Sequence, residues 1–382
     1  MDKRLAWHGV VALMVAHCVG MIDLVALPVW VGTLMERYRM DPQKAGSLVT
    51  LFLLGAVASS LFFAPRFHRV RPRLAATAGF GVAAVAFLGL SAAKGYAAMA
   101  VGHAVAGIVV ACALSFTHGT IGRSARPHRL FAIVGMSLGV FAILFLGATP
   151  HIVAQAGGPA LFVVFGALMA VASVVCAVAF PNAANAKDAK GAPALQRLDA
   201  PIVFGVLGVA CMALVQAMVF SFLERIGMER GFGSDTVTAV LIALGIVNLF
   251  PAPLAAFLEH RWPARKVLLC GPVVQAALAL LMTQSQGFAP YAAAAVFFAA
   301  VMIFTHTFAF GLLASLEPSG RVLAATPAML MTGSAIGPLL GGTVVKLVGY
   351  QGLGLAAAIV AAAAVLFFAR ARRPEAVCSV VA

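Results

Sequence analysis

Long apolar runs separated by short polar breaks dominate this chain of 382 residues. Twelve such runs lie near 8–32, 45–64, 74–93, 97–117, 130–150, 160–180, 201–223, 235–257, 267–285, 291–313, 323–345 and 352–369. Each has about twenty residues, the length that a helix needs to cross the hydrocarbon core of a bilayer. The runs are continuously apolar and do not alternate, which excludes the strands of an outer-membrane barrel. The pattern predicts an all-α membrane protein with twelve transmembrane helices.

Basic residues gather in every second polar break. If the N-terminus is cytoplasmic, nineteen of the 26 Lys and Arg residues lie in cytoplasmic segments and seven lie on the other side. This is the asymmetry that the positive-inside rule requires. We therefore expect a multi-pass protein of the cell inner (plasma) membrane with both termini cytoplasmic. The clustering also accounts for the net charge of +14 without a nucleic-acid partner.

The longest polar break, residues 181–199, is rich in Ala, Asn, Lys, Gly and Pro. Such a composition is typical of a flexible linker. It divides the chain into an N-terminal six-helix bundle, 1–180, and a C-terminal six-helix bundle, 200–382. We expect the linker between them to be cytoplasmic.

The two predicted bundles also resemble each other in sequence. RFHRVRPRL (66–74) follows the second run and RWPARKVLL (261–269) follows the eighth, at an offset of 195 residues. Arg66 then matches Arg261, and Arg71 matches Lys266. Many secondary transporters are built from such repeats, with the substrate site near mid-membrane between them.

These features resemble the major facilitator superfamily over nearly the whole chain. The family's loop motif is roughly G-x4-D-[RK]-x-G-[RK]-[RK]. Here Pro65 takes the place of its acid in the first half and His260 in the second, so the chain departs from the family motif at the acidic position of both loops. The basic residues of the two loops remain, namely Arg66, Arg69, Arg71, Arg261 and Arg265.

The eleventh run contains a glycine-rich stretch, GSAIGPLLGG (333–342). It is similar to the GPxxGG signature of drug:proton antiporters, which in those proteins lies in the fifth helix. The resemblance is therefore closest in pattern to drug and metabolite efflux members. Two roles stay open for Gly333, Gly337, Pro338 and Gly341: close helix packing through small residues, or bending during gating.

Asp23 is the only carboxylate in the interior of the twelve runs, since Asp235 is the first residue of the eighth run. A carboxylate at mid-membrane is costly unless it is protonated or paired, so it suits a proton-coupling site. The alternative is a structural Asp bonded to a neighbouring helix. In antiporter-like members the fourth helix often carries an R-x-x-x-G pattern, and His103 and Gly107 stand at that spacing. The resemblance implies that His103 replaces a permanent cation with a titratable one. Its depth matches that of Asp23, so we expect the two to share a proton; the alternative is a neutral buried histidine.

Polar or aromatic side chains within the second-half runs are candidates for binding the solute. The alternative for each is helix packing. The substrate-binding candidates are Gln216, Phe220, Asn248 and His306. Pro251 and Pro253 are expected to break the eighth helix just after Asn248. Glu224 and Arg225 are expected at the membrane interface, either solvated or as an outer gate.

Several kinds of protein are excluded or disfavoured by missing motifs. There is no Walker A motif, no GxSxG, and no spacing typical of a metal site, so we expect neither an enzyme nor a cofactor nor a metal. The sequence predicts a secondary transporter for a small organic solute, working by alternating access as a monomer. It is expected to be proton-coupled and an exporter. The alternatives are a non-transporting sensor or assembly protein on this scaffold, and an uncoupled uniporter.

Overall fold

The computed structural model describes residues 7–63, 66, 70–124, 127–181, 199–259, 261–316 and 326–371, and within them the regular structure is helical throughout. The helices are α1 (Trp7–Gly20), α2 (Ile22–Glu36), α3 (Pro42–Phe63), α4 (Pro72–Ala92), α5 (Tyr96–Gly122), α6 (Pro127–Ala156), α7 (Pro159–Ala179), α8 (Ala200–Phe220), α9 (Leu223–Glu229), α10 (Ser234–Val247), α11 (Pro251–Leu258), α12 (Ala264–Gln284), α13 (Phe288–Leu316) and α15 (Thr326–Arg370).

Eleven helical stretches in the described part are long and apolar enough to cross a membrane. The last of them has 41 residues and would extend about 62 Å, twice the thickness of the hydrocarbon core. It is broken at Gly349, whose φ of 73° is left-handed and favours glycine. The first arm of α15 (326–348) and its second arm (350–370) are thus two crossings. The predicted all-α fold with twelve spans is confirmed.

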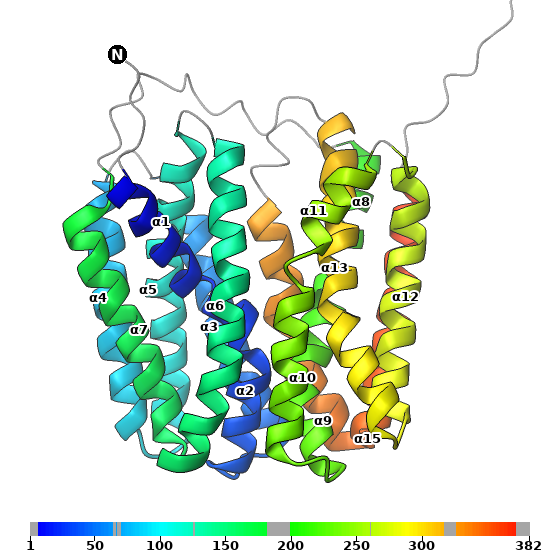
Figure 1. The fold of residues 1–382 in the computed structure, drawn as a ribbon, viewed down its shortest axis with the longest axis horizontal. Coiled ribbons are helices and arrows are strands. Elements are labelled where there is room, and N and C mark those ends of the chain that lie inside the picture. The colour runs from blue at the N-terminus through cyan, green and yellow to red at the C-terminus, as the bar shows by residue number, and fades with distance from the viewer. Residues whose placement is uncertain are drawn as a thin grey trace, which may run out of the picture.

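Figure 1 shows α1–α7 on one side of the molecule and α8–α15 on the other, and we call these the N half and the C half. The two halves meet chiefly through α3 with α15 and α6 with α10, and α2 also contacts α8 and α9. We call the end of the bundle at which α1 begins the near end, and the end at which α2 and α9 finish the far end. Residues 182–198, most of the predicted linker, lie outside the described residues.

The first span of each half is broken. Met21 separates α1 from α2 with φ −101° and ψ 24°, and Phe222 precedes α9 with φ −107° and ψ 3°. Neither break contains a proline. The eighth predicted span is broken as its sequence indicates, because α10 ends at Val247 and α11 begins at Pro251.

The repeat predicted from the two basic loops is visible in side-chain contacts. The Arg66 guanidinium lies 4.0 Å from the centre of the Phe62 ring, and Arg261 lies 4.7 Å from the Phe257 ring. Both residues of each pair are related by the offset of 195, so the same cation–π contact occurs twice. Arg71 immediately precedes α4 and Arg265 lies in the first turn of α12. Arg69, Pro65 and His260 lie outside the described residues.

Candidate functional site

Asp23 lies in the first turn of α2, two residues after the break at Met21. It is 6% exposed, and the backbone N–H groups of Asp23 and Leu24 face its carboxylate. The N-terminal end of a helix carries partial positive charge, which favours a carboxylate. Thirteen residues, about 20 Å of helix, separate Asp23 from Glu36 at the far end. The break therefore stabilises an acid deep within the membrane-spanning region.

His103 on α5 has other partners than Asp23. Its Nε2 accepts a hydrogen bond from the Trp30 indole at 3.2 Å, and its Nδ1 lies 2.7 Å from the carbonyl oxygen of Met99. The ring is 0% exposed and stacks on Trp30 with centroids 5.4 Å apart. Both ring nitrogens are satisfied when Nδ1 carries the only proton. No hydrogen bond joins His103 to Asp23 within the described residues, so the geometry favours the neutral buried histidine.

A histidine pair joins α1 to α5. His17 Nδ1 lies 2.9 Å from His118 Nε2, and the ring centroids are 5.1 Å apart. One ring donates and the other accepts, so the contact requires at least one neutral ring. The sequence analysis did not select His118, because it stands near the end of its apolar run without a motif around it.

The predicted substrate residues of the C half are dispersed. Gln275 on α12 is fully buried, and its Nε2 donates to the Met212 carbonyl at 3.2 Å and to Gln216 Oε1 at 3.4 Å. Its own Oε1 has no partner among the described residues. Gln216 is half-buried, so its amide is the more accessible of the two. The amide pair connects α8 to α12 and leaves one acceptor open.

Asn248, His306 and Phe220 lie apart from that pair. Asn248 follows α10 directly, and its buried Oδ1 has no partner in the described part of the chain. His306 Nδ1 lies 2.9 Å from the Met302 carbonyl oxygen, and its ring is 5.0 Å from Phe310. Phe220 is the buried last residue of α8, beside the break. No hydrogen bond within the described residues joins these three side chains into one site.

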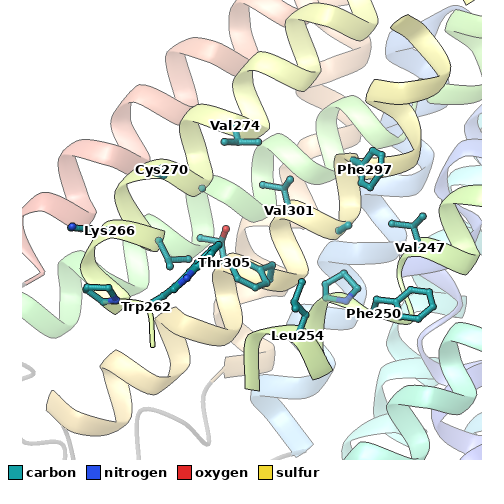
Figure 2. Close-up of a pocket in the computed structure, with 16 residues that line it drawn as sticks. Val247, Phe250, Leu254, Trp262, Lys266, Cys270, Val274, Phe297, Val301 and Thr305 are labelled. Carbon is teal, nitrogen blue, oxygen red and sulfur yellow. The ribbon is translucent and has the colours of Figure 1, made fainter. Parts of the chain in front are cut away.

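A cavity of about 660 Å³ lies between α10–α11, α12 and α13. Figure 2 shows Trp262 and Lys266 toward one end of it and Val274 and Phe297 toward the other. Phe250 and Phe297 are 62% and 53% exposed, so the cavity is open to the outside of the bundle. None of the predicted substrate residues lines it. The lining residues are Val247, Phe250, Pro251, Leu254, Trp262, Pro263, Lys266, Val267, Cys270, Gly271, Val274, Phe297, Ala300, Val301, Phe304 and Thr305.

The first arm of α15 lies directly against α8 and α3. A Cβ on Gly333 would meet the Ala210 carbonyl of α8, and one on Gly337 would lie 2.6 Å from the Ala217 methyl group. Gly341 is similarly close to Met218, at 2.7 Å from its carbonyl oxygen. These glycines permit a backbone approach that a side chain would prevent.

The contact between the halves is equally close on α3. A Cβ on Gly46 would meet the backbone of Pro338, and one on Gly342 would meet the backbone of Pro42. Pro338 breaks the regular pattern within α15, and the next amide, Leu339 N–H, donates to Thr50 Oγ1 of α3 at 3.1 Å. We call this the far-end contact, since α3 begins at the far end. There the two halves touch through backbone.

Two ion pairs also join the halves at the far end. Lys346 Nζ lies 3.5 Å from Asp41 Oδ2 and 3.1 Å from Gln43 Oε1, which joins α15 to the start of α3. Partial burial alone would raise the pKa of Asp41, but the Lys44 backbone N–H and the Lys346 ammonium hold it below its usual value. A second pair joins Glu36 of α2 to Arg225 of α9 at 4.0 Å.

Glu224 directly precedes Arg225 in α9 and lies at the same contact between α2 and α9. A Cβ on Gly32 of α2 would be 3.0 Å from Glu224 Oε2, so the carboxylate is packed against the other half. Glu224 Oε2 is buried and has no hydrogen-bond partner among the described residues. The prediction that Glu224 is solvated at the interface is wrong for this oxygen, which α2 covers, while the residue as a whole is half-buried.

The family profile of the Major Facilitator Superfamily matches residues 12–319. The chain belongs to the major facilitator superfamily. It is therefore a multi-pass secondary transporter of a small solute and not an enzyme. No curated protein is similar enough in sequence to match.

Solved structures support the fold of this major facilitator. A bacterial homologue of the human lysosomal transporter Spinster, inward-facing and unoccupied, has a TM-score of 0.75 at 15% identity over 97% of this chain and 98% of its own. The nucleoside transporter NupG has a TM-score of 0.74 at 14% identity, over 97% of this chain and 100% of its own. At these identities the likeness shows the fold alone.

Proposed function

We propose that this chain is a proton-coupled transporter that exports a small organic solute by alternating access. We also propose that the near end is cytoplasmic, as the basic loops indicate, in a bacterial-type inner membrane. The far-end contact is then the closed outer side of one state of the cycle. A single chain contains both halves and the contact between them, which supports action as a monomer.

The observation that carries this proposal is Asp23 at the break between α1 and α2. A buried acid that no cation neutralises changes protonation when its surroundings open to water. Interrupted helices near mid-membrane are where secondary transporters bind solutes and coupling ions. Asp23 combines both features and is the proposed coupling residue.

His103 enters the proposal in a different role from the one that the resemblance implied. Its two hydrogen bonds connect α2, through Trp30, to α5. It holds the helix that carries Asp23 and takes no proton itself. Gln216 is the proposed solute contact, because its half-buried amide lies next to an amide with an open acceptor.

The proposed direction of transport is export. Export is favoured by the GPxxGG-like stretch, which resembles that of drug antiporters. Of the two structural relatives, NupG is a nucleoside transporter and the other is a homologue of a lysosomal transporter. The substrate test therefore uses a panel that includes nucleosides and lipophilic cations.

The experiment uses proteoliposomes that contain a trapped pH-sensitive dye. Each solute of the panel is added to wild type, to Asp23→Asn and to the control Asp235→Asn, an exposed acid on α10. We expect at least one solute to move protons in wild type and in the control, and none to do so in Asp23→Asn.

Other outcomes assign the alternatives. Solute flux without proton movement in wild type indicates a uniporter. Binding without flux for every solute of the panel indicates a sensor or assembly protein. Equal proton movement in wild type and Asp23→Asn removes Asp23 from the coupling role.

A further inference from the structure

The broken first spans of the two halves place an acid at the same position. Asp23 is the second residue of α2, and Glu224 is the second residue of α9. Their depths differ: Asp23 is thirteen residues from the end of its span and Glu224 is five residues, or about 8 Å, from Glu229. The fold thus holds a second carboxylate with a buried oxygen, Glu224 Oε2, close to the far end.

Arg225 is the one cation that acts on this second carboxylate among the described residues, and no ion pair joins the two. Arg225, its neighbour in sequence, lies 3.0 Å from Glu229 and 4.0 Å from Glu36, so two other carboxylates share it. Glu36 itself faces Glu224 from α2 with the same charge. Tyr291 on α13 also faces Glu224, but its hydroxyl donates to the Leu223 carbonyl at 2.9 Å.

The other described elements around α9 add no hydrogen bond or ion pair to Glu224. α10 contributes one charged residue, Asp235, which is an exposed acid. The Tyr350 hydroxyl of α15 donates to Glu229 Oε1 at 3.3 Å, so Tyr350 is a partner of Glu229 and not of Glu224. Burying an ionised carboxylate without a partner is strongly unfavourable, whereas a neutral carboxyl group is tolerated. The closed far end therefore selects the protonated form of Glu224.

We propose that Glu224 is a proton-binding site of the far end: its protonated form stabilises the closed contact with α2, and its ionised form favours separation of the halves. The proton comes from the aqueous phase on the far side and returns there, because Oε2 is buried while the contact is closed. Glu224 thus responds to pH on one side and does not carry a proton across, unlike Asp23. The inference rests on the proposed alternating access and is independent of coupling at Asp23.

The test measures the distance between the halves directly. Gln155→Cys on α6 and Thr236→Cys on α10 are both exposed at the far end, and they receive spin labels in a variant without the six native cysteines. Double electron–electron resonance in nanodiscs, without added solute, then gives the open and closed fractions against pH. Asp235→Asn serves as the control.

We expect the ratio of open to closed protein in wild type to rise by about tenfold per pH unit over the range in which one proton is released. Glu224→Gln keeps the far end closed throughout this range, and Asp235→Asn follows wild type. An unchanged pH dependence in Glu224→Gln would overturn the inference.

A second variant decides the matter if Glu224→Gln does not fold. Glu36→Gln removes the facing negative charge and releases Arg225, so both effects favour ionised Glu224. The midpoint of opening then shifts to lower pH, and an unchanged midpoint contradicts the proposal. Asp23→Asn, measured with the same labels, separates the two proposals. It is expected to lose solute-driven proton movement and to keep the pH-dependent distance.

Discussion

At the scale of single residues, the role of a histidine follows from its hydrogen bonds. A histidine that titrates during transport needs a nitrogen free to gain a proton. His103 has none, since Trp30 donates to one nitrogen and the Met99 carbonyl accepts from the other. The residue therefore serves to position α2 against α5.

His103→Ala is expected to lower stability and to leave proton coupling intact. The substitution leaves the buried Trp30 N–H without an acceptor, which costs about 1–3 kcal/mol, in addition to the cavity. Thermal unfolding in detergent measures the loss, and His151→Ala, an exposed histidine, is the control. A variant of normal stability without solute-driven proton movement would restore His103 to the coupling site.

The two acids show what sequence reasoning reaches at this scale. Asp23 stands out because it interrupts a long apolar run. Glu224 looks like an ordinary residue at the end of a helix, because its burial comes from Gly32 in the other half. A contact between residues nearly two hundred positions apart leaves no local pattern in the sequence.

At the scale of helices, the glycines of α3 and α15 separate two kinds of close packing. Gly46 faces the Pro338 backbone across the two halves, whereas Gly333 faces Ala210 within the C half. A methyl group at the first site is accommodated when the halves part. At the second site it disturbs the packing of one bundle.

Gly46→Ala is therefore expected to lengthen the far-end distance between labels at 155 and 236, with little change in melting temperature. Gly333→Ala is expected to lower the melting temperature, since overpacking costs about 1–3 kcal/mol. Gly89→Ala on α4 is the matched control, because a Cβ there meets nothing within 4 Å. The distinction fails if Gly46→Ala unfolds as easily as Gly333→Ala.

The helix breaks differ in whether the sequence predicts them. The break after Asn248 is predicted by Pro251, because proline has no backbone N–H to donate to the helix that precedes it. The breaks at Met21 and Phe222 have no such residue, and only the structure reveals them. The feature that most strongly marks the candidate site is therefore the one that a propensity argument misses.

At the scale of the whole molecule, the ion pair of Asp41 with Lys346 is expected to make a small contribution to closing the far end. Its side chains are 31% and 44% exposed, and such pairs contribute about 0–1 kcal/mol. Lys346→Ala should raise the ratio of open to closed protein by up to about fivefold. The same label pair measures this, and added salt should reduce the effect.

The pH range separates this ion pair from Glu224. Because the pKa of Asp41 is lowered by its partners, the pair is formed above the ordinary pKa of about 4 and is lost as pH falls through the lowered value. The effect of Lys346→Ala should thus be constant between about pH 5 and 8. A strong pH dependence in this interval would show that another group controls the pair.

Length, apolar runs and loop charge suffice to predict the number of spans and the superfamily, since each reflects the bilayer and not the detailed packing. The contacts between the halves depend on which glycines and acids face each other, and these are set by the tertiary structure. The predicted linker, the loop residue Arg69 and the termini fall outside the described residues.

The single-residue turn at Gly349 has a mechanical consequence. The first arm of α15 forms the far-end contact, and the second arm follows it after one residue, with no loop to absorb movement. Any tilt of the first arm must carry the second arm with it, and Ile359 and Leu366 on that arm are 73% and 58% exposed on its surface. Opening the far end therefore displaces lipid, and the thickness and lateral pressure of the surrounding bilayer enter the energy of the transport cycle.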